Sequence, residues 1–169
     1  MVILGLDPGT AATGYGIVRV EGNRLRSVDY GCVLTDAHTP PEERLATIGR
    51  AIDALLAEHE PAAAAVEEVY VGGNPRTALA VGQARGAVLT ICGLRYVTVA
   101  EYSVSAIKTA VCGYGRADKS QVQRMVAAVL GLPAPPKSDH AADALAAAIC
   151  HASQIPLAAS MRRAGVVGP

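Results

Sequence analysis

Apolar residues fill three short runs in the first 35 positions of the chain, separated by glycine-rich or polar turns. The runs at residues 2–7, 14–20 and 25–35 have the composition of strands, and EGN at residues 21–23 is a turn sequence. The run VILGL at residues 2–6 is too apolar to lie exposed, which indicates a central strand buried on both faces. This pattern predicts a three-stranded meander.

Helices and strands alternate after the meander. The segment TPPEE at residues 39–43 suits a first helical turn, and apolar residues then recur at helical spacing to about Glu58. A fourth strand is expected at residues 62–69, although its alanines favour a helix, and a fifth at residues 95–100. Further helices are expected at residues 76–92, 103–112, 118–131 and 138–153. This order predicts an α/β fold with a five-stranded mixed sheet, the first strand central, flanked by helices.

The length and composition predict one domain. A chain of 169 residues can bury a core, which must be aliphatic because Phe and Trp are absent. We expect this domain to span residues 1–153 and the Ala/Gly/Pro-rich residues 154–169 to form a flexible tail. Four scattered cysteines without a Cys-x-x-Cys pair indicate reduced thiols in a cytoplasmic protein. No apolar run approaches the length of a membrane span, and no signal-peptide pattern begins the chain.

Charge is balanced overall, with 15 basic and 15 acidic residues, but it is divided along the chain. Residues 1–71 hold 11 acids and 5 bases, whereas residues 72–125 hold 7 bases and 2 acids. An acidic region joined to a basic one fits metal ions held beside a polyanion. Ordinary solvated helix faces are the alternative explanation.

Acidic side chains stand at the ends of two apolar strands. Asp7 ends the first strand, where a buried carboxylate is costly unless it is paired, protonated or bound to a metal, and a turn cap is its other interpretation. Glu67 and Glu68 follow the run AAAAV at residues 62–66. Because neighbouring side chains in a strand point to opposite faces, only one of the two glutamates can face Asp7. The alternation by itself does not decide which one.

The run SDHAADAL at residues 138–145 adds potential ligands from a helix. His140 and Asp143 are three positions apart and share a face, whereas Asp139 could serve instead or cap the helix. Asp143 lies among alanines, where an unpaired charge is unfavourable. Carboxylates from separate elements suffice for Mg²⁺, and two such ions about 3.5–4 Å apart can clamp the oxygens of a phosphodiester displacement.

Several motifs, in this order, resemble those of the RuvC family of bacterial Holliday-junction resolvases. They are LGLDPGT with TGYG, VEEVY, GQARG, GYGRADKSQVQ and HAADALA, and they cover about residues 1–153. The resemblance implies a ribonuclease H-like homodimer that nicks opposing strands of four-way DNA junctions in recombination and repair. It implies Mg²⁺ or Mn²⁺ as cofactor, two ions in each active site, and a branch-migration helicase as a partner.

Carried over position by position, the resemblance assigns metal binding and catalysis to Asp7, Glu67 and Asp143, and so selects Glu67 over Glu68. Where the family's common pattern has another Asp, this chain has His140, whose imidazole is a softer ligand than a carboxylate. We therefore predict that His140 is a metal ligand and that Mn²⁺ supports cleavage better than Mg²⁺. Lys119 is implied to assist catalysis near the scissile phosphate.

The expected DNA contacts come from two regions. In the loop at residues 113–119, glycines let the backbone approach a phosphate and Arg116 and Lys119 supply charge, although a plain helix connection capped by Asp118 also fits. The resemblance adds Lys108 to this group. The second region holds Tyr70, Asn74 and Arg76. The resemblance places Tyr70 against junction bases, on which its ring would stack, and a core tyrosine is the alternative interpretation. Asn74 and Arg76 are expected to contact the DNA backbone.

Two other functions fit parts of the sequence. The Asp-x-Gly-Thr turn at residues 7–10 also resembles the phosphate-binding hairpin of actin-like ATPases, but those proteins need two such lobes. A junction-binding module with weak or no catalysis is the second alternative, because His140 replaces a family acid. A nicking assay on a synthetic four-way junction separates the enzyme from the module.

Overall fold

A computed structural model describes residues 1–68 and 75–163, with the backbone alone for residues 75–77 and 156–163. Five strands form one mixed sheet in the order β3-β2-β1-β4-β5. Their bounds are β1 (Val2–Asp7), β2 (Ala12–Glu21), β3 (Arg24–Leu34), β4 (Ala63–Glu67) and β5 (Val99–Tyr102). Strand β1 pairs antiparallel with β2 and parallel with β4, so the predicted central position of the first strand is confirmed.

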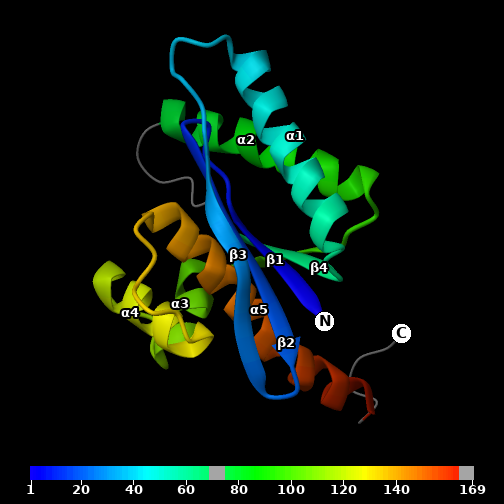
Figure 1. Ribbon diagram of the computed structural model, residues 1–169, viewed down its shortest axis with the longest axis vertical. Helices are drawn as coiled ribbons and strands as arrows, with labels where there is room; N and C mark the ends of the chain where they lie inside the picture. The colour runs from blue at the N-terminus through cyan, green and yellow to red at the C-terminus, as the bar shows by residue number, and fades with distance from the viewer. Residues whose placement is uncertain (69–74, 164–169) are drawn as a thin grey trace.

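Helices cover both faces of the sheet (Figure 1). On one face lie α1 (Pro41–His59) and α2 (Pro75–Leu94), and on the other lie α3 (Val104–Cys112), α4 (Lys119–Leu130) and α5 (Asp139–Arg163). Alternate residues of β1 serve the two layers: Leu4 and Leu6 pack in the core with α1 and α2, and Ile3 packs in the core with α5. The α/β arrangement expected from the sequence is therefore present.

Helix α5 lies unusually close to the sheet because glycines face it. A Cβ atom on Gly5 of β1 would overlap the backbone carbonyl of Ala144, and one on Gly14 of β2 would overlap that of His140. Side chains at these two positions would push the helix away from the strands. The glycines thus set the distance between the C-terminal end of β1 and the first turns of α5.

Two element boundaries differ from the predicted ones by more than two residues. Helix α2 continues to Leu94, and Tyr96 then turns the chain with a left-handed φ of 56°, so β5 begins at Val99 and not at residue 95. Helix α5 continues to Arg163, past the predicted end at residue 153, and passes through Pro156. A proline removes one helical hydrogen bond and bends a helix without always ending it. Residues 164–169 of the expected tail lie outside the described residues, and the domain boundary stays a prediction.

The cysteines are free thiols, as expected. Cys92 and Cys150 are buried, and Cys32 and Cys112 are half-buried. Across residues 1–68 and 75–163, no helix combines the length and the apolar character needed to span a membrane.

Candidate active site

The C-terminal ends of the parallel strands β1 and β4 place two acidic side chains on the same face of the sheet. Asp7 shares the face of Ile3, which packs in the core with α5. In β4, Ala65 belongs to that core and Val66 to the opposite one, so alternation puts Glu67 on the α5 face with Asp7. The fold thus places Glu67, and not Glu68, on the same face of the sheet as Asp7, while Glu68 is exposed.

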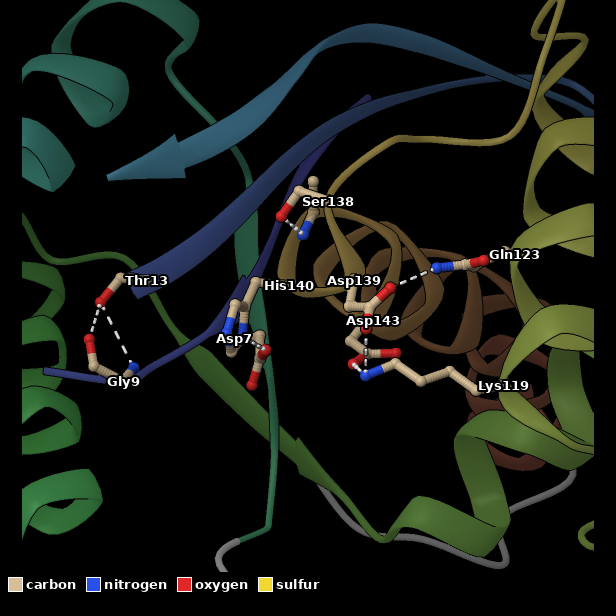
Figure 2. Close-up of polar contacts among 10 residues, drawn as sticks. Asp7, Gly9, Thr13, Lys119, Gln123, Ser138, Asp139, His140 and Asp143 are labelled. Atoms are coloured by element: carbon tan, nitrogen blue, oxygen red, sulfur yellow. Dashed lines mark hydrogen bonds and ion pairs between the residues drawn. The ribbon is translucent and has the colours of Figure 1, made fainter. Parts of the chain in front are cut away.

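The turn that follows Asp7 is held by a buried threonine that the sequence analysis did not single out. The Thr13 hydroxyl is fully buried, donates to the Gly9 carbonyl at 2.8 Å and lies 3.3 Å from the Gly9 amide, which donates to it (Figure 2). One side chain therefore satisfies both backbone groups of Gly9. The available signal was a polar residue at the start of the otherwise apolar and glycine-rich run TGYG.

His140 faces Asp7 from the first turn of α5. Its Nδ1 atom lies 2.6 Å from Oδ2 of Asp7, and in Figure 2 the two side chains point toward each other. The helix start is capped by Ser138, whose hydroxyl accepts a hydrogen bond from the Ala141 amide at 3.4 Å. The capping role considered for Asp139 therefore falls to Ser138.

Lys119, the first residue of α4, lies between two carboxylates of α5. Its Nζ atom is 2.9 Å from Oδ2 of Asp139 and 3.8 Å from Oδ2 of Asp143. Gln123, one turn later on α4, donates from Nε2 to Oδ1 of Asp139 at 2.6 Å (Figure 2). Asp139 is thus engaged on both oxygens by α4, and this pairing with Lys119 was not anticipated from the sequence.

The carboxylates of the site perturb one another. Burial, followed by the negative charges of Asp7 and Asp143, raises the pKa of Glu67 to about 7, against the opposing effect of Lys108 and Lys119. Burial and the charge of Asp7 likewise raise the pKa of Asp143. Such raised values mean that the negative charges lack sufficient compensation, which is the situation that a bound cation relieves.

A pocket of about 190 Å³ opens between the carboxylates and the lysines. Glu67, Asp143, Lys108 and Lys119 supply its charged lining, and side chains of α3 and α4 form its apolar wall: Val104, Ile107 and Val122. Acidic and basic groups thus face one space. A phosphate held by the lysines would lie beside the carboxylates.

The donor chemistry fits a hard divalent cation, because the site offers carboxylate oxygens and one imidazole. However, within the described part of the chain no three His, Cys, Asp or Glu side chains are grouped so that they could hold an ion as they stand. Asp7 is turned to His140, and Asp143 lies near Lys119. The backbone brings the predicted ligands to one edge of the sheet without gathering their side chains around one point.

The remaining predicted DNA contacts are placed only in part. Lys108 lines the pocket, and Arg116 is exposed on the loop between α3 and α4. Asp118 caps α4 by accepting from the Gln121 amide at 2.9 Å, so the loop also has the features of a plain helix connection. Tyr70 and Asn74 lie outside the described residues, as does the side chain of Arg76.

Comparison with known proteins gives consistent matches over most of the chain. A family model described as crossover junction endodeoxyribonuclease RuvC matches residues 3–151. The RuvC protein of Desulfitobacterium hafniense is 52% identical over 157 residues, 93% of this chain and 95% of that protein. That of Heliobacterium modesticaldum is 51% identical over 155 residues, covering 92% and 96% respectively.

A solved structure matches as well. Thermus thermophilus RuvC in complex with a Holliday junction substrate superposes with a TM-score of 0.90 at 36% identity, covering 94% of this chain and 96% of that one. The ribonuclease H-like fold expected from the sequence is confirmed by this match.

Proposed function

Because the chain belongs to the RuvC family of crossover junction endodeoxyribonucleases, we propose that it resolves four-way DNA junctions by nicking two opposing strands. The observation that carries this proposal is the meeting of Asp7, Glu67 and Asp143 at one edge of the sheet, beside a pocket lined by two lysines. The related Thermus protein has been solved with a Holliday junction substrate, which fits the same substrate for this chain.

The family is one of divalent-metal-dependent nucleases, and we propose Mg²⁺ or Mn²⁺, two ions in each active site. Such ions stabilise the attacking and leaving oxygens of a phosphodiester displacement. Asp7, Glu67 and Asp143 would hold them, with His140 as the fourth ligand. Burial, with the neighbouring charges of Asp7 and Asp143, raises the pKa of Glu67, and a bound cation would relieve this strain on its charged form. Binding an ion in this way requires side-chain rotations at Asp7 and Asp143.

The lysines have a separate task in the proposed reaction. Lys119 and Lys108 line the same pocket as Glu67 and Asp143, so their charges would partly neutralise a phosphate that enters it. Lys119 stays protonated because Asp139, foremost, and Asp143 raise its pKa. Arg116, Tyr70, Asn74 and Arg76 would extend the contact along the DNA. Of these four residues the structure describes the side chain of Arg116, which is exposed on the loop between α3 and α4, as this role requires.

Paired nicks suit a two-fold symmetric dimer, because each protomer then cuts one strand of a two-fold symmetric substrate. Helix α2 offers a face for this contact: Leu79 is 66% exposed, and Gly82 and Gly86 have open space where a Cβ would lie. Small residues let another helix approach closely. A branch-migration helicase as a partner rests on the family alone, and a cytoplasmic location rests on the scattered, reduced cysteines.

The deciding experiment is a nicking assay on a synthetic four-way junction with each strand labelled in turn, in Mn²⁺ and in Mg²⁺. We expect nicks at symmetric positions in two opposing strands and none in a linear duplex of the same sequence. The variant Asp7→Asn, purified in parallel, excludes a contaminating nuclease. Junction binding without nicking in either metal would favour the binding module instead.

A further inference from the structure

Arg85 lies on the inner side of α2, within the GQARG motif at residues 82–86, and the proposed reaction gives it no role. Its side chain is only 13% exposed. One terminal nitrogen lies 2.6 Å from Oε2 of Glu101 on β5, and the other donates to the backbone carbonyl of Glu67 at 3.2 Å. A single guanidinium therefore joins α2 to the ends of two neighbouring strands.

The carbonyl of Glu67 is the last of β4, and its hydrogen bond comes from a side chain. The next amide, that of Glu68, donates to the carbonyl of Tyr102 at 2.9 Å and keeps β4 beside β5. Arg85 approaches from the α2 face of the sheet, whereas the Glu67 side chain points to the α5 face. The strand end is thus held from the side opposite to the pocket.

The end of β4 has this backbone anchor, but the Glu67 carboxylate has no described side-chain partner. Among the side chains that the structure describes, none makes a hydrogen bond or an ion pair with its oxygens, so none of these orients it. Asp7 and Asp143, in contrast, are each located by a partner, His140 and Lys119 respectively. Repulsion from Asp7 and Asp143 acts on Glu67 as well. A displaced strand end would move this carboxylate away from the other two.

We propose that Arg85 is a positioning residue that fixes the end of β4, and through it the Glu67 carboxylate, for metal binding and cleavage. This inference rests on the proposed function, in which Glu67 is a metal ligand. Lysine cannot replace arginine here, because one ammonium group does not present two rigid donors to a carboxylate and a carbonyl at once.

The test compares Arg85→Lys with two matched controls. Glu101→Gln weakens the ion pair but leaves the hydrogen bond to the Glu67 carbonyl. Arg95→Lys alters a separate ion pair that lies away from β4. In this pair Arg95, the residue after α2, donates from two of its nitrogens to the Asp53 carboxylate of α1 at 2.6 and 2.8 Å. Four properties are measured: the melting temperature, the junction Kd, the Mn²⁺ Kd by electron paramagnetic resonance, and the cleavage rate constant at saturating junction.

We expect Arg85→Lys to keep its fold and its junction Kd while Mn²⁺ affinity and the cleavage rate constant each fall about tenfold or more. Hydrogen exchange at the Glu68 amide should quicken in the metal-free variant. Glu101→Gln should lose much less, and Arg95→Lys should match the wild type. If Arg85→Lys does not fold, Arg85→Gln, which keeps an amide donor without the charge, is measured in the same way.

Wild-type Mn²⁺ affinity in a folded Arg85→Lys variant would overturn the inference. So would an equal loss in Glu101→Gln, because the ion pair alone would then explain the effect. Failure of the proposed function is separate: the wild type would not nick junctions, while Mn²⁺ affinity and exchange at Glu68 would still depend on Arg85.

Discussion

Oδ2 of Asp7 and Nδ1 of His140 lie 2.6 Å apart although 133 positions separate the two residues in the chain. The contact joins the end of the central strand β1 to the first turn of α5. It is possible because Gly14 leaves room for the backbone of His140. Any ion that binds the Asp7 carboxylate will therefore have an imidazole beside it.

Replacing Asp7 by Asn should remove cleavage but keep junction binding. The amide has nearly the shape of the carboxylate but no charge to hold a cation, so the rate constant should fall about 100-fold or more. Single-turnover cleavage and a gel-shift Kd measure the two properties. If this variant nicked junctions at the wild-type rate, Asp7 would not be a metal ligand.

Replacing His140 by Asp should change the preferred metal. A carboxylate favours Mg²⁺ more than an imidazole does, so the ratio of the Mn²⁺ rate to the Mg²⁺ rate should drop about tenfold from the wild-type value. Rates are compared at one pH for both metals. If the wild type already cleaves equally well or better with Mg²⁺, His140 does not have the role that we assign to it.

Replacing Asp139 by Asn should give a milder defect than replacing Asp143 by Asn. Asp139 is exposed and holds Lys119, whereas Asp143 is proposed to hold metal. For Asp139→Asn we therefore expect a loss of about threefold to tenfold in the cleavage rate constant. Mn²⁺ affinity should be close to that of the wild type. If the two variants were equally inactive, Asp139 would be a metal ligand as well.

The metal-free protein should lose stability as pH rises from about 4.5 to about 7, because Glu67 has a raised pKa of about 7 when folded. A carboxyl group with a higher pKa in the folded state takes up protons on folding. Its contribution to stability is therefore complete when the pH is below the pKa of the unfolded state, and it is lost as the pH rises through the pKa of the folded state. Urea unfolding in the presence of a chelator, at several pH values, gives the free energy of unfolding of the wild type and of Glu67→Gln.

The informative quantity is the free energy of unfolding of the wild type minus that of Glu67→Gln. This difference should fall across the window and level off above it. A difference that stays flat or rises with pH would show that Glu67 is not protonated in the folded protein near neutral pH.

Replacing Gly14 by Ala should destabilise the fold and disturb the site together. The added methyl group meets the backbone carbonyl of His140, which cannot rotate away, so we expect a cost of about 1–3 kcal/mol in the free energy of unfolding. Gly93→Ala is the control: its Cβ meets open space in α2, and a gain of about 0.4–1 kcal/mol is expected. Equal stability of Gly14→Ala and the wild type would contradict this packing.

Most of the fold was predictable because strands and helices leave local patterns. The apolar run of β1, the turn sequence between β2 and β3, and the helical spacing of α1 identified elements in their correct order. The larger errors occurred at two boundaries: the start of β5, which depends on where Tyr96 turns the chain, and the end of α5, where Pro156 did not stop the helix. A turn or a helix end depends on contacts that a local pattern does not contain.

The sequence by itself determined the family, the order of the elements and the acidic residues that end them, because these are properties of consecutive positions. Only the tertiary structure decided which side chains meet. It placed Glu67 on the α5 face, turned His140 to Asp7, and engaged Asp139 with Lys119 and Gln123. Such pairings depend on how closely α5 and α4 pack against the sheet and each other, and that distance is set by glycines and cores assembled from residues far apart in the chain.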